Sequence, residues 1–118
     1  MYYVKGKKET QKLLFDVQME LGNYHEALKN LEAIRDRNDF DYLIRLAKWN
    51  DHLGDLKTAI TFMEKAKDIA ERENNKVLKI WSYSNLGDFY GHAGRIQESY
   101  DCYLKTLAID PNYSYALK

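Results

Sequence analysis

Apolar and small residues recur at the same offsets after three glycines of the chain. Gly22, Gly54 and Gly94 are each followed two residues later by an apolar side chain and five residues later by a small one. Beyond the small residue, apolar positions recur three or four residues apart, which predicts one buried stripe on an α-helix. The stripe after the second glycine comprises Ala59, Phe62, Met63, Ala66, Ile69 and Ala70. Separations of 32 and 40 residues between the glycines indicate a repeated unit.

Each unit is predicted to be a hairpin of two helices. The glycine can adopt a positive φ angle, which ends the first helix. Asn23 and Asp55 stand where a side-chain oxygen can cap the second helix, and Asn23 and Glu26 have capping-box spacing. Arg95, at the third such position, is a poor cap. First helices are expected near 8–21, 40–53 and 76–93, and second helices near 24–37, 56–73 and 96–109.

Small residues are expected where the two helices of a hairpin cross at close range. Ala27, Ala59 and Ser99 supply these positions on the second helices. On the third first helix, Gly87 is the corresponding small residue, and a branched side chain there would not fit. Phe15 and Ala47 take this place in the first two units. The large Phe15 is therefore expected to widen the first hairpin.

Residues 83–90 of the chain, Tyr-Ser-Asn-Leu-Gly-Asp-Phe-Tyr, resemble the tetratricopeptide signature W-x₂-L-G-x₂-Y, with Tyr83 in place of the tryptophan. Gly94, Tyr103 and Pro111 fall where that family places its turn glycine, its aromatic residue and its closing proline. The resemblance covers residues 8–113 and is looser in the first two repeats. It implies an all-α fold, a right-handed α-α superhelix of three antiparallel helix pairs.

The domain organisation that follows is a single domain over residues 1–118. Its repeats are expected at about 8–39, 40–79 and 80–113, and residues 114–118 read as the start of a truncated or capping helix. The lengthened spacing is similar to that of repeats in bacterial sensor and regulator proteins. Because the seven residues after Pro111 are too few to cover the apolar face of the last hairpin, we expect either a fragment of a larger protein, bacterial if this likeness holds, or an end that a second copy covers, with contacts from Tyr113 and Tyr115.

The composition excludes several partners. Lys plus Arg and Asp plus Glu number 18 each, so no net charge favours nucleic acid or an anionic membrane. No apolar run approaches the roughly 20 residues of a membrane-spanning helix, and the first eight residues do not read as a signal peptide. A cytoplasmic location is expected. Cys102 is the single cysteine and is predicted to be a packing residue in a reducing compartment.

The family resemblance implies that the first helices line a concave surface. We expect its ligand contacts from residues that face away from the core on these helices, where Trp81 either contacts a ligand or packs beneath its extended helix. Asn85 resembles the asparagine with which family members hold a peptide backbone. Asp16 and Asp88 on these helices would repel the carboxylate tails of chaperones, which excludes that ligand. The predicted partner-binding residues are Lys12, Asp16, Arg45, Lys48, His52, Trp81, Asn85 and Asp88.

The function predicted from these features is that of a protein-interaction scaffold or adaptor without catalytic activity. No nucleophile, phosphate-binding or dinucleotide motif occurs in the sequence. His52 and His92 lie on neighbouring first helices beside Glu20, but helix axes roughly 8–10 Å apart are too distant for a zinc site without a third ligand. No metal or cofactor is expected. Two alternatives are self-assembly through the terminal repeats and a sensory or regulatory part of a larger enzyme or signalling protein.

Overall fold

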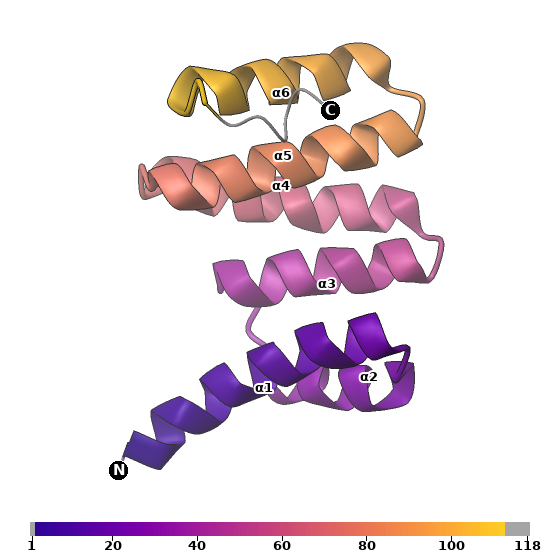
Figure 1. The fold of residues 1–118 in the computed structure, drawn as a ribbon, viewed down its shortest axis with the longest axis vertical. Coiled ribbons are helices and arrows are strands. Elements are labelled where there is room, and N and C mark those ends of the chain that lie inside the picture. The colour runs from indigo at the N-terminus through magenta and orange to yellow at the C-terminus, as the bar shows by residue number, and fades with distance from the viewer. Residues whose placement is uncertain (1, 113–118) are drawn as a thin grey trace.

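The computed structural model of the chain describes residues 2–112, with side chains from residue 8 onward. Its regular structure over this range consists of helices that follow one another in antiparallel pairs and stack along one direction (Figure 1). The pairs form three hairpins of an α-α superhelix, as expected. The helices are α1 (Tyr2–Leu21), α2 (Tyr24–Ala33), α3 (Phe40–His52), α4 (Leu56–Arg72), α5 (Lys76–His92) and α6 (Ile96–Ile109).

The turns within the hairpins confirm the predicted role of the glycines. Gly22, Gly54 and Gly94 have φ angles of 80°, 85° and 78°. In each turn the amide after the glycine donates to a carbonyl five residues back, as Asp55 does to Asn50 at 2.9 Å. This is the Schellman arrangement that satisfies the free carbonyls of a helix end. Between α4 and α5, Asn74 takes the same role with a φ angle of 51°.

Only one of the two predicted caps on the second helices is formed by a side chain. The Asp55 carboxylate accepts a hydrogen bond from the Thr58 amide at 3.2 Å, as expected. The Asn23 prediction was wrong, because its exposed side chain makes no capping bond. The capping box is also absent, since the Glu26 carboxylate lies 3.6 Å from the Lys29 ammonium. The residue type alone does not decide this, because the Asn75 carboxamide does cap α5 by accepting from the Leu78 amide at 3.1 Å.

Helix α2 is shorter than expected and ends at Ala33 rather than near residue 37. The residues that follow it form a polar turn in which the Asp36 carboxylate accepts from the Asn38 amide at 3.0 Å and the Asp39 amide donates to the Asp36 carbonyl at 3.0 Å. Aspartate side chains compete with helical hydrogen bonds in this way. The expected start of α1 at residue 8 was also wrong, because the helix begins at Tyr2.

The hydrophobic core is divided into two clusters. One lies in the first hairpin and includes Phe15, Leu31 and Tyr42, the last contributed by α3. The other extends from α3 to α6 and includes Leu43 and Met63. Helix α3 therefore belongs to both clusters and joins the first hairpin to the rest of the stack.

The small residues expected at the helix crossings are buried. Ala27 and Ala59 are fully covered, and Ser99 donates a hydrogen bond to the Gly87 carbonyl at 2.7 Å. Phe15 is 1% exposed and forms the centre of the first cluster. Residues 113–118, where a further helix was expected to start, lie outside the described residues, as do Tyr113 and Tyr115.

Candidate functional site

A cavity of about 270 Å³ lies across the first helices of all three hairpins. Helix α1 contributes one lining residue, α3 contributes three and α5 contributes four, with the α5 residues at positions i, i+3, i+4 and i+7. That spacing places them on one face of the helix. The lining residues are Asp16, Ile44, Arg45, Lys48, Trp81, Ser84, Asn85 and Asp88.

Six of the eight predicted binding residues line this cavity, and Lys12 and His52 do not. Ile44 and Ser84 line it as well but were not among the predicted residues. They stand in the same column as Lys12 in the aligned repeats, so the sequence carried the signal for them. The three helix faces that the alignment grouped thus lie at one cavity, while their individual side chains differ in accessibility.

Arg45 forms the polar wall between α1 and α3. Its Nη2 donates to the Asp16 carboxylate at 2.8 Å and its Nη1 donates to the Asp41 carbonyl at 3.1 Å. Its Nε donates to the Lys12 carbonyl at 3.4 Å. These bonds join the first two hairpins with polar contacts, beside the apolar contacts that Tyr42 makes in the first cluster. The guanidinium is thereby neutralised and fixed at the edge of the cavity.

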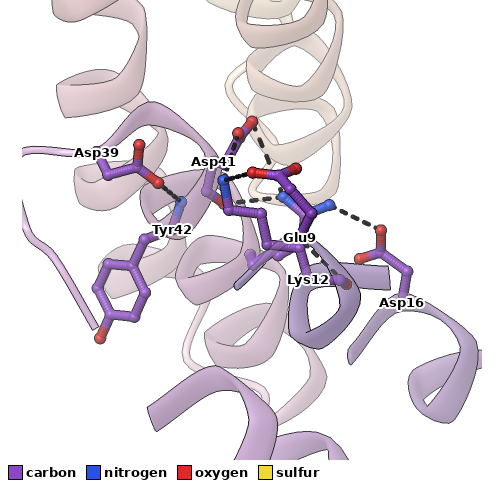
Figure 2. A network of polar contacts seen from close by, with 7 residues as sticks. Glu9, Lys12, Asp16, Asp39, Asp41 and Tyr42 are labelled. Atoms are coloured by element: carbon purple, nitrogen blue, oxygen red, sulfur yellow. Dashed lines mark hydrogen bonds and ion pairs between the residues drawn. The ribbon is translucent and has the colours of Figure 1, made fainter. Parts of the chain in front are cut away.

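Lys12 is buried in the same junction. Its ammonium donates to the carboxylates of Asp41 at 3.0 Å and Glu9 at 3.2 Å (Figure 2). Burial lowers the pKa of this amine, but the hydrogen bonds to the two carboxylates outweigh it, so the pKa lies above its ordinary value. With an exposed fraction of 8%, Lys12 presents its charge to its neighbours on α1 and α3. The structure therefore gives it a place in the helix junction, outside the cavity lining.

The floor of the cavity carries side chains that are open to a ligand. The Trp81 indole is 47% exposed, so it is not covered beneath its helix. The Asn85 carboxamide is folded back and donates to the Trp81 carbonyl at 2.7 Å, which leaves its oxygen free to accept. The Asp88 carboxylate accepts from the Tyr103 hydroxyl. Lys48 is exposed and forms no ion pair with any described side chain.

The comparison with known families agrees with this architecture. The family model described as Tetratricopeptide repeat matches residues 39–112, more than half of the chain. The chain belongs to the tetratricopeptide repeat family. The matched region contains α3 to α6, so the second and third tetratricopeptide hairpins carry the match and the first, with its large Phe15, lies outside it.

Two solved structures of MamA have a similar fold. One is 23% identical with a TM-score of 0.71 over 92% of this chain, and the other is 22% identical with a TM-score of 0.71 over 98% of this chain. The chain spans about three-fifths of their length, 61% in each case. None of the curated proteins matches the chain. The likeness supports the tetratricopeptide fold, including the first hairpin.

His52 contacts aromatic residues at the end of α3. Its ring stacks on Tyr24 with centroids 3.9 Å apart and lies 5.5 Å from the Trp49 ring. This stack ties the start of α2 to the end of α3. Over the range that the structure describes, no three His, Cys, Asp or Glu side chains come together as metal ligands.

Cys102 packs on the inner face of α6 in the tetratricopeptide core. It is 8% exposed, as expected for a packing residue. Burial raises the pKa of its thiol to about 11, so little of it is thiolate at neutral pH. None of the helices in the described part of the chain is long and apolar enough to cross a membrane.

Proposed function

We propose that this tetratricopeptide repeat protein is a non-catalytic interaction scaffold that binds an extended or helical segment of a partner protein in the cavity between its first helices. The observation that carries the proposal is that side chains from α1, α3 and α5 converge on one cavity in which Trp81 is half exposed. A tryptophan in a concave site is a favourable anchor, because it offers a large apolar area at low entropic cost. Membership of the repeat family supports the general role.

The chemistry of the cavity favours a ligand with charges of both signs and one apolar side chain. Lys48 offers a cation that pairs with none of the described carboxylates, and Asp88 offers a carboxylate. Asn85 can accept a hydrogen bond from a peptide N–H through its free oxygen, while its amide nitrogen donates to the Trp81 carbonyl. A terminal carboxylate pair is disfavoured beside Asp16 and Asp88, so we do not expect chaperone tails to bind.

The test is capture of partners from an extract of the native host, with the native chain and Trp81→Ala/Asn85→Ala in parallel. We expect a partner that the native chain retains and the double variant loses, while the helical circular dichroism of both chains is the same. A control is Val77→Ala/Lys76→Ala on α5, because Val77 is 57% exposed but lies outside the cavity. Equal retention by all three chains would show that the cavity is not the binding site.

A second candidate function is self-assembly through the terminal helices. It is favoured by exposed apolar residues on the outer helices, namely Leu13, Val17 and Leu21 on α1 and Ile96, Tyr100 and Leu104 on α6. Such residues at both ends of a repeat stack are surfaces that a neighbouring repeat would cover. Light scattering over a range of concentrations distinguishes the two functions, since a monomer at every concentration contradicts self-assembly and leaves the scaffold role intact.

We place the protein in the cytoplasm as part of the same proposal. Cys102 is a free thiol. Free thiols are typical of reducing compartments. Fractionation of the host with detection of the native chain tests this placement.

A further inference from the structure

Two uncharged stripes lie on the hairpins at opposite ends of the helix stack (Figure 1), one on α1 and one on α6. In each stripe the residues follow one another at steps of four, three and four positions, which places them on one face of the helix. Charged residues make up 31% of the chain, yet neither stripe carries one. The α1 stripe comprises Thr10, Leu14, Val17 and Leu21, and the α6 stripe comprises Ile96, Tyr100, Tyr103 and Leu107.

The junction between α4 and α5 shows what covers the α1 stripe positions elsewhere in the stack. Leu14 and Val17 lie eight and five residues before the turn glycine of their hairpin, as Leu86 and Phe89 do in the third hairpin. Leu86 and Phe89 are 1% and 5% exposed, and they belong to a core cluster that includes α4 side chains. Val17, by contrast, is 51% exposed. Helix α1 therefore presents one half of a hairpin junction without the helix that would cover it.

Helix α6 presents the other half of this junction. On α4, Ile60 lies six residues after the turn glycine and is buried in the cluster that contains the α5 side chains, with Leu56 packed against it. The equivalent residues of α6 are Tyr100 and Ile96. Both are exposed, because no described helix follows α6 in the stack. The two ends of the chain thus carry the two different sides of one kind of contact.

The outer surface of α6 is more apolar than the buried surface that it repeats. Glu64 on α4 accepts a hydrogen bond from the Tyr90 hydroxyl of α5, whereas Leu104 takes the equivalent position on α6. In the same way Leu107 takes the position of Lys67. A terminal repeat that faces water requires a polar outer face. These two replacements have the opposite effect, so they favour a surface that another helix covers.

We propose that copies of this chain associate head to tail, with α6 of one copy packed on α1 of the next as α4 packs with α5 within the chain. The proposal rests on the self-assembly put forward above as the second candidate function, and it names the interface. The partner is a second copy because each end of the chain supplies the side of the junction that the other end lacks. Removal of Val17, Tyr100 and their stripe neighbours from water drives the association.

An interface between two different surfaces leaves one α1 stripe and one α6 stripe free in every assembly, so further copies can add. The stack runs in one direction (Figure 1), and each added copy extends it. The row of first helices would then continue from α5 of one copy to α1 of the next. We expect the average mass of the native chain to rise steadily with concentration instead of stopping at a dimer.

Two substitutions at exposed positions block one end each. Val17→Glu places a carboxylate on the α1 stripe, and Tyr100→Glu places one on the α6 stripe. Each variant should remain a monomer in sedimentation velocity at concentrations at least about tenfold above those at which the native chain associates, because an unpaired charge is costly to bury. The control is Val77→Glu, which adds the same charge at an exposed residue of α5 outside both stripes and should associate as the native chain does. Circular dichroism shows whether all three variants are folded.

Mixing the two blocked variants identifies the surfaces that meet. The Val17→Glu chain retains a native α6 stripe and the Tyr100→Glu chain retains a native α1 stripe, so an equimolar mixture can form one native interface. We expect dimers and nothing larger in this mixture. If either variant associated when alone, like ends would be pairing and the head-to-tail arrangement would be overturned. A mixture that stays monomeric would overturn it as well.

The same measurements separate this interface from the functions proposed above. A native chain that is monomeric at every concentration would overturn self-assembly together with the interface, and would assign the stripes to a different protein or to a further repeat. Association that both blocked variants retain would leave self-assembly standing and overturn the contact between α6 and α1 alone. Capture of a host partner stays a separate test, since Val17 and Tyr100 do not line the cavity of the first helices.

Discussion

Gly87 lies at the tightest crossing of the third hairpin, and replacing it with alanine tests how closely α5 and α6 approach. A Cβ atom at this position would lie 2.6 Å from Cε1, 2.9 Å from Cζ and 3.0 Å from Cδ1 of the Tyr103 ring. The ring cannot move freely, because the Tyr103 hydroxyl donates to the Asp88 carboxylate. Four residues along the same helix, a Cβ on Gly91 would meet only the Ser99 hydroxyl, at 3.4 Å. The two glycines therefore form a matched pair.

The two glycine substitutions are expected to change the free energy of unfolding in opposite directions. Alanine in place of a glycine in a helix interior stabilises by about 0.5–1 kcal/mol. At Gly87 this gain is opposed by about 1–3 kcal/mol of overpacking and by about 1 kcal/mol for the displaced hydrogen bond of Tyr103. We expect Gly87→Ala to lower the free energy of unfolding by about 1–3 kcal/mol. Gly91→Ala should raise it by about 0.5–1 kcal/mol.

Urea unfolding followed by circular dichroism measures both variants, and a thermal scan should show about 4 °C per kcal/mol. The decisive control is Gly87→Ala in a Tyr103→Ala background, where the ring is gone and only the gain in helix propensity remains. The sign of the Gly87 effect should then reverse. If Gly87→Ala is as stable as the native chain, the helices are farther apart than the structure places them and the reasoning is refuted.

Two further predictions concern a cap and a thiol. Asp55→Ala should lower the urea midpoint of unfolding at neutral pH and Asn23→Ala should lower it much less, because of these two residues only Asp55 accepts a capping bond. Hydrogen bonds from the Thr58 side chain and amide lower the pKa of Asp55. The stabilisation by this cap is therefore complete above about pH 4 and is lost as the pH falls further. Equal urea midpoints for the two variants would contradict the assignment of the cap to Asp55. Cys102 should react with iodoacetamide at pH 8 far more slowly in the folded chain than in urea, because its pKa is about 11 in the fold and about 8.5 when unfolded. As the pH rises from about 8.5 to about 11, the unfolded thiol releases its proton before the folded one, so the free energy of unfolding should fall. Equal alkylation rates in the folded chain and in urea would show that the thiol is accessible in the fold.

The helix pairs could be predicted from the sequence because each turn has a local cause. Gly22, Gly54 and Gly94 adopt the positive φ angles for which glycine is suited, and they end the first helices where the pattern placed them. The end of α2 could not be predicted in the same way. Its apolar spacing continues through Leu31 and Ile34, and the helix ends because aspartates bond to the turn backbone instead. The spacing of apolar residues carries no information on this competition between side-chain and helical hydrogen bonds.

The helix faces that line the candidate cavity could be predicted from the sequence, but which of their side chains are open to a ligand could not. Aligned repeats place Asp16, Lys48 and Asp88 on equivalent helix faces, and all three line the cavity. Lys12 stands in the column of Ile44 and Ser84, all three of which are buried, and carboxylates from α1 and α3 surround it. The distance between two helices and the partners across it depend on tertiary packing, which one sequence does not specify.

The position of α3 fixes one wall of the proposed binding cavity. Ile44, Arg45 and Lys48 line that cavity from one side of the helix. Arg45 bonds to α1, and Leu43 and Ala47 pack in the core, which holds the helix against rotation. A segment that binds there would meet a preformed wall, which lowers the entropic cost of binding.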